Sequence, residues 1–402
     1  MSTHQHRSGH GGQERRIGVI GAGIAGLTTT IALHRAGFPV TVFERTPVMD
    51  VAGVGIQLTP NASRLLARLG LAERLADVAS RPRSVDVHRW DDGSLLTRMP
   101  LGDECAGLFG APYYTVHRGD LQRVLLDAVP PEYLELGHRC TEVRAGSGAA
   151  TAVFANGARQ EFDVLLGADG IHSVVRRTMV ADAPKFSGLI AYRGLVDADD
   201  VPEFRDDHRL RAWFGPGQHC VCYPVSAGRA LSFTAMAAAD IGQDTAVSPA
   251  GRRDSLLAAY RGWDPRLVAL LAAADGVSRW ELHDRNPLSR WSTPRLTLLG
   301  DAAHPMLPFR AQGANQGIED AVVLAECLAT AGEDASAALY RYERARRPRT
   351  TRIQRDSRES ARAFHLGDGG GQHERDRRMS GQWTLRSHEW LFGYRAEHAA
   401  VA

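Results

Sequence analysis

The stretch Arg16-Ile17-Gly18-Val19-Ile20-Gly21-Ala22-Gly23-Ile24-Ala25-Gly26 decides the fold. Its first apolar residues predict a short buried strand, and the apolar spacing that follows predicts a helix. Gly21, Gly23 and Gly26 lie between these two elements. Their spacing allows a tight turn, a close approach of the backbone to a pyrophosphate, and close packing of the helix on the strand. The free N–H groups at the start of the helix would then face the phosphates.

A second predicted strand, residues 40–43, ends at Glu44. An acidic residue about 20 positions after the glycines is what the hydroxyl groups of a ribose require. A strand, a glycine turn, a helix and this carboxylate together predict a dinucleotide site. The alternative is a tight strand–helix turn with no ligand.

Composition excludes several classes of protein. The 402 residues are enough for two domains or one large elaborated domain. The 48 basic and 46 acidic residues are nearly balanced, which argues against a nucleic-acid or membrane-surface protein. No apolar run approaches the roughly 20 residues that span a bilayer.

The cysteines and the N-terminal histidines give no indication of a metal site. The five cysteines are odd in number and form no C-x-x-C pair, so neither a disulfide framework nor a zinc site is expected. A reducing cytoplasm fits this usage. His4, His6 and His10 could bind a metal, but residues 1–14 are expected to be a disordered tail.

Two later strands also end in an acidic residue beside glycine. Residues 164–168 lead into Asp169-Gly170, and residues 296–299 lead into Gly300-Asp301. Ligands bind at the carboxyl ends of strands in open α/β sheets, although Asp169 could also be an ordinary turn residue. A proline-stiffened loop and a helix after Gln312 follow, and the start of such a helix carries a partial positive charge.

Between residues 191 and 280 the sequence is strand-like and aromatic, which predicts a mostly antiparallel substrate sheet. His219 and Tyr223 are four positions apart on a predicted strand, so both side chains project from one face. They could flank an aromatic substrate, with His219 accepting a phenolic proton. They could equally be two ordinary half-buried side chains of a sheet.

Other segments have structural interpretations. Hairpins are predicted around Asp92-Gly93 and around Asn156-Gly157. The arginine-rich residues 335–366 predict a solvated or packing helix that Pro348 should kink. Residues 367–371 are expected to be a flexible loop, and the aromatic residues after 382 should dock on the body. His304 is either catalytic or, more in keeping with its turn, a bracing residue.

Three motifs, Gly21-x-Gly23-x-x-Gly26 with Glu44, Asp169-Gly170 with Arg176, and Gly300-Asp301, occur in this order. Together they resemble the single-component FAD-dependent aromatic hydroxylases, the para-hydroxybenzoate hydroxylase family. The nearest likeness is to its salicylate, 3-hydroxybenzoate and 6-hydroxynicotinate hydroxylase branch. The resemblance covers nearly the whole chain from Arg16 onward.

The resemblance implies roles for residues of all three motifs and of the substrate sheet. The implied FAD contacts are Gly21, Gly23, Ala25, Gly26, Glu44, Arg45, Arg118, Asp169, Gly170, Gly300, Asp301, Pro308, Gly313, Ala314 and Asn315. The implied catalytic residues are His219 and Tyr223, and the implied substrate contacts are Arg193, Arg211, His219, Tyr223, Pro308 and Arg310. No metal is implied.

Three arginines need comment. From spacing alone, Arg118 could as well be a solvated or salt-bridged residue. Arg310 departs from the family pattern, and it could pair with a substrate carboxylate or lie on the surface. Gly393-Tyr394-Arg395 stands where Gly-Tyr-Asp is common in the family.

The resemblance also implies the architecture. The fold class is α/β (α+β), a Rossmann-like FAD-binding domain with a mainly antiparallel-sheet substrate domain and a C-terminal helical segment. The expected FAD-binding domain is discontinuous and comprises residues 15–82, 110–182 and 285–365. The expected substrate domain comprises residues 83–109 and 183–284, and residues 366–402 form a docking segment.

The implied activity is hydroxylation of a small hydroxylated aromatic or N-heteroaromatic acid, with or without loss of its carboxylate. NADH or NADPH would reduce FAD, and O2 would add to the flavin C4a as a hydroperoxide. The expected protein is a cytoplasmic monomer or homodimer without a nucleic-acid partner or an integral membrane segment. Two alternatives stay open, a flavin-dependent halogenase and a non-catalytic flavin- or nucleotide-binding module. The halogenase W-x-W-x-I-P pattern is missing, and such modules lack a stiff proline loop.

Overall fold

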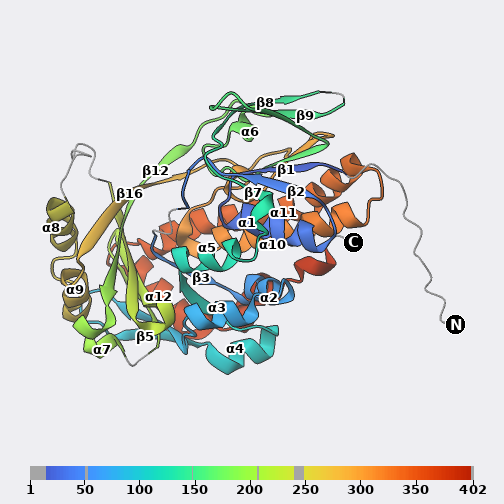
Figure 1. The fold of residues 1–402 in the computed structure, drawn as a ribbon. Coiled ribbons are helices and arrows are strands. Elements are labelled where there is room, and N and C mark those ends of the chain that lie inside the picture. The colour runs from blue at the N-terminus through green and yellow to red at the C-terminus, as the bar shows by residue number, and fades with distance from the viewer. Residues whose placement is uncertain (1–14, 50–52, 147, 206–207, 240–248, 400–402) are drawn as a thin grey trace.

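The computed structural model describes residues 15–49, 53–146, 148–205, 208–239 and 249–399. The predicted tail, residues 1–14, with its three histidines lies outside the described residues. Two sheets dominate the fold, and helices pack between and around them (Figure 1).

The first sheet has five strands in the order β17-β11-β1-β2-β7, and every pair is parallel. The strands are β1 Ile17–Ile20, β2 Val40–Phe43, β7 Leu134–Glu135, β11 Val164–Gly167 and β17 Leu296–Leu298. Ile20 is level with Gly167, which is in turn level with Leu298. The three acidic motifs therefore leave the sheet at the same edge, because parallel strands end together.

Helices cover this sheet, and their apolar faces form the largest core of the molecule. They are α1 Ile24–Arg35, α5 Arg118–Leu126, α6 Val174–Arg177, α10 Gly313–Ala329 and α11 Ala335–Phe364. Helix α1 packs directly on α10, and α10 packs on α11. Helix α11 runs through Pro348 as one continuous element. A three-stranded sheet of β8 Cys140–Ala145, β9 Ala150–Phe154 and β10 Arg159–Phe162 contains the predicted hairpin around Asn156-Gly157.

The second sheet has seven strands in the order β16-β12-β15-β14-β13-β4-β5. Its strands are β4 Ser84–Arg89, β5 Leu95–Pro100, β12 Lys185–Asp197, β13 Leu210–Gly215, β14 Gln218–Val225, β15 Ala230–Ala238 and β16 Gly276–Asp284. Only the pair β13–β4 is parallel, so the prediction of a mainly antiparallel sheet is confirmed. Helices α8 Pro249–Ala259 and α9 Pro265–Ala272 lie beside this sheet, and residues of both enter its own core (Figure 1).

The remaining strands and α-helices lie outside these sheets. They are β3 Gly55–Leu58, which pairs with β6 Tyr114–His117, and the helices α2 Pro60–Arg68, α3 Ala72–Val78, α4 Gly102–Phe109, α7 Pro202–Arg205, α12 Gly370–Gln382 and α13 Glu389–Phe392. Two differ from prediction. The turn-rich stretch before Pro60 contains strand β3, and the expected loop 367–371 is cut short because α12 begins at Gly370.

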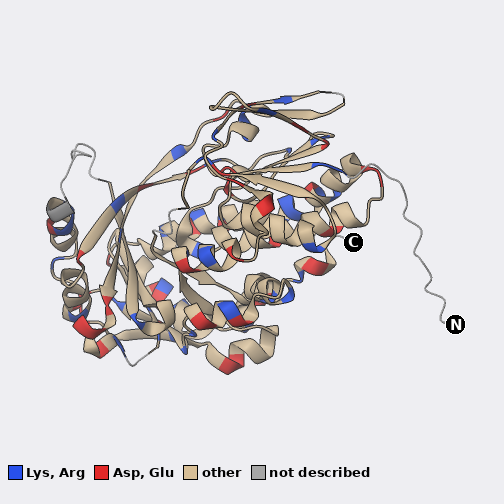
Figure 2. Cartoon of the chain, in the orientation of Figure 1, with Lys and Arg blue, Asp and Glu red and all other residues tan. Residues whose placement is uncertain are grey.

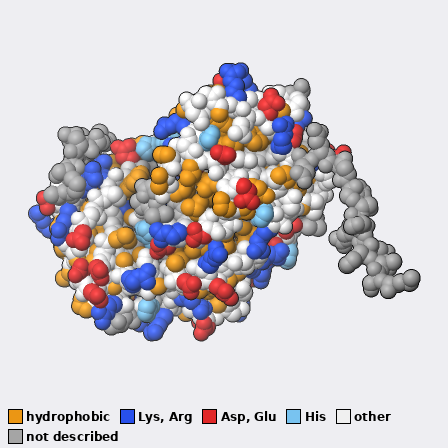
Figure 3. Space-filling view, viewed as in Figure 1, with side chains coloured by type: hydrophobic (Ala, Val, Ile, Leu, Met, Phe, Trp, Pro, Cys, Tyr) orange, Lys and Arg blue, Asp and Glu red, His pale blue; other side chains and the backbone are white. Residues whose placement is uncertain are grey.

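The C-terminal segment docks on the body, as predicted. Leu385, Leu391 and Phe392 are buried in a third core that also contains residues of β4 and β13. The proposed division into domains stands as a proposal, supported by the separate cores of the two sheets. Positive and negative side chains are interspersed over the fold (Figure 2) and over the face shown in Figure 3, where hydrophobic side chains gather near the middle. Within the described part of the chain, no helix combines the length and the apolar character needed to cross a bilayer.

Candidate functional site

The glycine turn after β1 is shaped by close backbone contacts. Gly21 has a φ of +103°, and a Cβ atom on it would lie 2.5 Å from the carbonyl oxygen of Ala168. A Cβ atom on Gly26 would collide with the carbonyl oxygen of Gly21. A Cβ atom on Gly23, by contrast, would have no neighbour within 4 Å. The turn therefore leaves open space in front of α1, where a phosphate could sit.

The start of α1 is suited to an anion. No side chain caps this helix, and its first turn contains no acidic residue. Glu44 lies beside the same turn, where its Oε2 atom accepts a hydrogen bond of 3.0 Å from the backbone N–H of Ala22. Arg45 follows on the exposed side. Free helix N–H groups next to one carboxylate match a pyrophosphate joined to a ribose.

The second motif adjoins the glycine turn. A Cβ atom on Gly21 would lie 3.0 Å from Cα of Asp169. Oδ2 of Asp169 accepts a hydrogen bond of 2.6 Å from the N–H of Val174 and so caps α6, whereas its buried Oδ1 has no partner among the described residues. Burial raises the pKa of Asp169. Gly170 has a φ of +77°, which favours glycine at this turn.

The third motif reaches α1 from the other side. Gly300 has a φ of +57°, and a Cβ atom on it would lie 2.9 Å from Cβ of Ala25. The next residue, Asp301, lies deep in the protein. Its side chain is nevertheless accessible to solvent, because it faces a cleft. This deep position raises the pKa of Asp301, although His304 and Arg118 oppose the rise.

Arg176 connects the second and third motifs. Its buried guanidinium forms an ion pair of 2.6 Å with Asp182. Its Nη1 atom also donates hydrogen bonds to the carbonyl oxygens of Ala302 and Ala303, at 2.9 and 3.0 Å. The three motifs therefore converge at one edge of the first sheet.

Helix α10 is anchored beneath this edge by a buried ionic cluster. Arg346 contacts Glu319 at 2.5 Å and Asp320 at 2.8 Å, and all three side chains are fully buried. Asp320 also contacts Nε2 of His304 at 2.6 Å and accepts a hydrogen bond from the N–H of Gly300. His304 is thus a bracing residue. The pKa of Asp320 is lowered to about 2, since the positive charges and hydrogen bonds around it outweigh its burial.

Three other predicted FAD residues, Gly313, Ala314 and Asn315, lie at the start of α10. Gly313 lies near Asp301, and a Cβ atom on it would be 3.8 Å from Oδ1 of that residue. Asn315 instead uses its buried side chain to bond the backbone of Gln57 and Thr59. Its amide therefore holds β3 against α10 and does not face the cleft.

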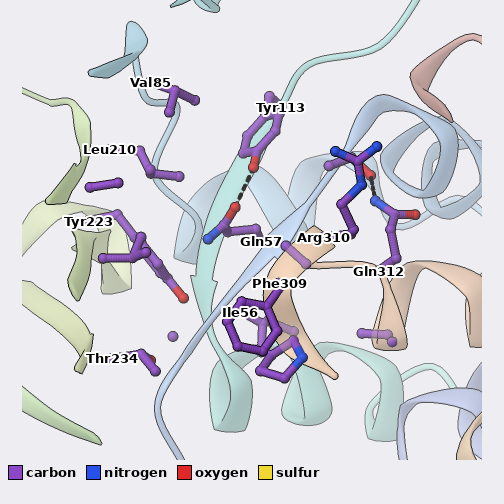
Figure 4. A pocket seen from close by; sticks show the side chains of 18 of the residues that line it. Ile56, Gln57, Val85, Tyr113, Leu210, Tyr223, Thr234, Phe309, Arg310 and Gln312 are labelled. Atoms are coloured by element: carbon purple, nitrogen blue, oxygen red, sulfur yellow. Dashed lines mark hydrogen bonds between the residues drawn. The ribbon is translucent and has the colours of Figure 1, made fainter. Parts of the chain in front are cut away.

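A cavity of about 320 Å³ lies between the start of α10, the face of the second sheet and the C-terminal segment. Figure 4 shows side chains from the second sheet and from the segment just before α10 around this cavity. Its lining includes Arg118, Asp301, Pro308, Gly313 and Ala314 on the α10 side. Phe364, Trp383, His388, Leu391 and Phe392 form a wall that no local motif indicated.

Strand register explains which sheet residues reach the cavity. Arg193 of β12 is level with Thr234 of β15, which is level with Val221 of β14. His219 and Tyr223 flank Val221 on the same face, because alternate residues of a strand share a face. All five line the cavity. Cys220 and Cys222 face the opposite core, as predicted.

His219 is held in an apolar wall. Its ring lies 5.3 Å from that of Phe309, centroid to centroid, and its Nδ1 is 2.7 Å from Nε2 of His365. Burial, and to a lesser degree His365, hold the pKa of His219 well below its ordinary value. The imidazole is therefore neutral near pH 7, the form that can accept a proton.

Two tyrosines, Tyr113 and Tyr223, also line the cavity. Burial raises the pKa of Tyr223 to about 12, so its hydroxyl keeps its proton. Tyr113 donates a hydrogen bond of 2.5 Å to Oε1 of Gln57 (Figure 4). Sequence reasoning assigned no role to Tyr113, Gln57 or His365. The long helix that includes His365 in its predicted range was expected, but nothing local marked these three side chains.

The three candidate substrate arginines differ in placement. Arg193 lines the cavity, and its buried Nε has no hydrogen-bond partner among the described residues; burial lowers the pKa of this side chain. Arg310 also lines the cavity, 4.0 Å from Asp356. Arg211 does not, because it alternates with Leu210 and Ala212 and instead lies over the ring of Phe204 on the other face. The prediction of a substrate contact from Arg211 is therefore not supported by its position.

These residues fit a bound FAD. The glycine turn leaves space for a pyrophosphate, Glu44 is in place for a ribose, and Asp301 faces the cleft that leads to the cavity. The described residues contain no group of three or more potential ligands that could hold a metal ion.

Comparison with known proteins agrees with this geometry. The model of the family described as "FAD binding domain" matches residues 14–357. The chain is 43% identical to a 3-amino-4-hydroxybenzoate 2-monooxygenase from Streptomyces cremeus over 94% of this chain and 95% of that protein. It is 35% identical to a 6-hydroxynicotinate 3-monooxygenase from Bordetella bronchiseptica, over 85% and 90% of the two chains.

Solved structures show the same fold. A variant of Klebsiella pneumoniae HpxO, crystallised with FAD, superimposes with a TM-score of 0.86 at 27% identity, and the match covers 94% of this chain and 98% of that one. The halogenase alternative is not favoured by these relatives, and a non-catalytic module is not among them. The chain belongs to the family of FAD-dependent aromatic monooxygenases.

Proposed function

We propose that the substrate is a small benzoate carrying a ring hydroxyl, with 3-amino-4-hydroxybenzoate as the first candidate to test. The 43% identity to a monooxygenase of that compound supports this choice. The observation that carries it is Arg193, a cation that faces the cavity and whose buried Nε has no partner among the described residues. A substrate carboxylate would supply the missing charge and hydrogen bond.

In this proposal His219 acts on the substrate hydroxyl. Because Nδ1 of His219 contacts Nε2 of His365, Nε2 of His219 is left to face the cavity. A proton on Nδ1, donated to His365, makes Nε2 the acceptor. Removing the phenolic proton would make the ring a better nucleophile. Tyr223, which stays protonated, would donate a hydrogen bond to the substrate.

Bound FAD, reduced by NAD(P)H, supplies the activated oxygen from O2. The chain would hold it through the residues that converge on α1. Gly21, Gly23 and Gly26 would approach the pyrophosphate, Glu44 the adenosine ribose, and Asp301 the ribityl chain. The apolar C-terminal wall would exclude water from the reacting ring. A cytoplasmic location is also proposed, since all five cysteines are buried free thiols.

The test uses purified holoenzyme and a panel of substituted benzoates and nicotinates. We expect 3-amino-4-hydroxybenzoate to stimulate NAD(P)H oxidation, and mass spectrometry of the product would show whether the carboxylate is retained. His219→Asn should keep FAD and substrate affinity but lower coupled turnover by about 10²-fold or more, releasing hydrogen peroxide instead. Normal coupled turnover in this variant would exclude His219 as the base, and no stimulation by any hydroxybenzoate would exclude the substrate class.

A further inference from the structure

The buried side chain of Arg349, in α11, joins two other helices of the molecule. Its guanidinium forms a bidentate pair with Glu319 of α10, in which Nε lies 2.8 Å from Oε2 and Nη2 lies 2.9 Å from Oε1. The same guanidinium donates hydrogen bonds to the carbonyl oxygens of Trp390 and Leu391 in α13, at 3.1 and 2.9 Å. One side chain therefore holds α13 against α10.

Both of these helices contribute to the cavity that contains His219. Gly313 and Ala314, at the start of α10, line it, and so do Leu391 and Phe392 of α13. The side chains of Leu391 and Phe392 are buried. The position of α13 relative to α10 therefore sets part of the shape of the cavity.

The contacts of Arg349 require a guanidinium. The last carbonyl groups of a helix have no partner within the helix, and α13 has only four residues, Glu389–Phe392. A guanidinium offers five N–H donors in one plane, so it can bind a carboxylate and two carbonyl groups at once. The centre of the Tyr394 ring lies 3.8 Å from Cζ of Arg349, which adds a stacking contact to the same group.

A neighbouring arginine contacts the same segment in a different way. Cζ of Arg352 lies 3.7 Å from the centre of the Trp390 ring, and the side chain of Arg352 is more than half exposed. Its ion pair is with Asp356 of its own helix, at 3.8 Å. Among the described residues, no hydrogen bond or ion pair links Arg352 to α10. It therefore touches the segment from the solvent side without fixing it to that helix.

We propose that Arg349 is a positioning residue that fixes the C-terminal wall of the cavity around the bound substrate. Because it holds α13 on α10, it keeps Leu391 and Phe392 in place, and these side chains enclose the ring and exclude water. A closed cavity favours transfer of oxygen to the ring. In a loosened cavity the two electrons of NAD(P)H reduce O2 to hydrogen peroxide instead. This inference rests on the proposed function, because it places an aromatic substrate in the cavity.

The experiment compares Arg349→Lys with the parent, both loaded with FAD. Lysine keeps a positive charge beside Glu319 but cannot bind the carboxylate and both carbonyl groups together. Amide hydrogen exchange, which needs no substrate, should become faster in residues 389–394 and stay unchanged in β1. At saturating 3-amino-4-hydroxybenzoate, coupled turnover should fall about tenfold or more, with a matching rise in hydrogen peroxide. The dissociation constant of the benzoate should change less than the coupled turnover.

Two further variants make this comparison specific. Arg352→Met is the matched control, because it removes a cation from the Trp390 ring and leaves the link between α13 and α10. It should change neither the exchange nor the peroxide yield. Tyr394→Leu removes the ring stacked on Arg349 and leaves the pair with Glu319. It should raise the exchange and the peroxide yield by smaller amounts, and it tests the proposal even if Arg349→Lys does not fold.

Three results would overturn the proposal. Unchanged exchange in Tyr394→Leu and in any folded Arg349→Lys would show that the arginine does not fix the wall. Faster exchange with the parent's peroxide yield would show that the wall does not control the reaction. Equal effects in Arg352→Met would show that any loss of charge near Trp390 suffices. If the parent hydroxylates no benzoate, the proposed substrate is wrong, and the exchange measurement still decides whether Arg349 holds α13.

Discussion

Two interior arginines have opposite surroundings. Arg346 is fully buried, and Glu319, Asp320 and the side chain of Gln316 contact its guanidinium. Arg193 lines the cavity, and among the described residues its buried Nε has no hydrogen-bond partner and its guanidinium has no ion pair. The carboxylates raise the pKa of Arg346, whereas burial lowers the pKa of Arg193.

This difference separates a structural charge from one kept for a ligand. Burial of an unpaired ion costs several kcal/mol, so a fold retains one only where something offsets the cost. For Arg346 the carboxylates of Glu319 and Asp320 offset this cost, and the same contacts hold α11 against α10. At Arg193 we infer that the substrate carboxylate supplies it. The following predictions test that distinction.

The largest effect is expected from breaking the internal cluster. Arg346→Met leaves two buried carboxylates short of a partner and should lower the free energy of unfolding by about 3–5 kcal/mol. Chemical denaturation of the holoenzyme, with FAD release as a second signal, measures this. The control is Arg347→Met, whose arginine is half exposed and contacts Glu343 at 3.5 Å. A loss no larger than that of the control would mean that the cluster is not structural.

Removing the charge of Arg193 should weaken substrate binding without lowering stability, the reverse of the effect expected for Arg346. Arg193→Gln should leave the free energy of unfolding unchanged or higher, because a desolvated charge is lost without stranding a partner. The dissociation constant of the hydroxybenzoate should rise about 10–100-fold. Titration with 2-aminophenol, which lacks the carboxylate, provides the control and should give equal affinities for both enzymes. A weaker affinity for both ligands would show that Arg193 shapes the cavity without binding the carboxylate.

The histidine pair extends the comparison to pH. The ring of His304 has a carboxylate partner, whereas the ring of His219 is hydrogen-bonded, among the described residues, to His365. Burial and, to a lesser degree, Arg375 lower the pKa of His365 to about 4. In the unfolded chain His365 has its ordinary pKa of 6.5, so as the pH falls it is protonated there before it is protonated in the folded chain. The contribution of His365 to the free energy of unfolding is therefore full above about pH 6.5 and is lost as the pH falls toward about 4.

We therefore expect His365→Asn to reduce the slope of the free energy of unfolding against pH between these values. The reduction should correspond to at most about one proton in the difference between the protons bound by the unfolded and folded states. Parallel denaturation curves of the two proteins between pH 7 and pH 5 measure the difference. Equal slopes would show that His365 is not neutral in the folded enzyme.

The smallest effect is expected at Arg211. This arginine lies on the face of β13 away from the cavity, over Phe204. Arg211→Gln should change the dissociation constant of the hydroxybenzoate by less than about twofold, which corresponds to under about 0.5 kcal/mol. The same titration measures it. A loss comparable with that of Arg193→Gln would mean that charge near the sheet, without direct contact, governs binding.

Most of the FAD side could be predicted because its signals are local. Glycines that need a positive φ or a close backbone contact, such as Gly21 and Gly300, can be recognised from the residues around them. The strand that carries His219 and Tyr223 was predicted from its strand-like, aromatic sequence, and the alternation of side chains along a strand places these two on one face. The same alternation places the neighbouring residues Arg211 and Leu210 on opposite faces of their strand, so only one of them could line the cavity.

The substrate side was predicted less completely. His365 meets His219 across 146 positions of the chain, and Trp383 joins the cavity wall from the C-terminal segment. Neither residue carries a local pattern, because each acquires its role from packing. The side chain of Asn315 shows the same dependence on packing, since its amide bonds the backbone of β3, and a contact of this residue with FAD stays a prediction.

Local chemistry in the chain thus specified the nucleotide turn and the acidic strand ends, because backbone conformation and strand periodicity depend on neighbouring residues. The reaction class followed from the resemblance of the three motifs to a known family. Which arginine stays unpaired, which histidine lies beside His219 and what closes the cavity depend on long-range packing. Those properties arise only when the sheets, α10 and the C-terminal segment meet, since pairing and desolvation are set by contacts between distant segments.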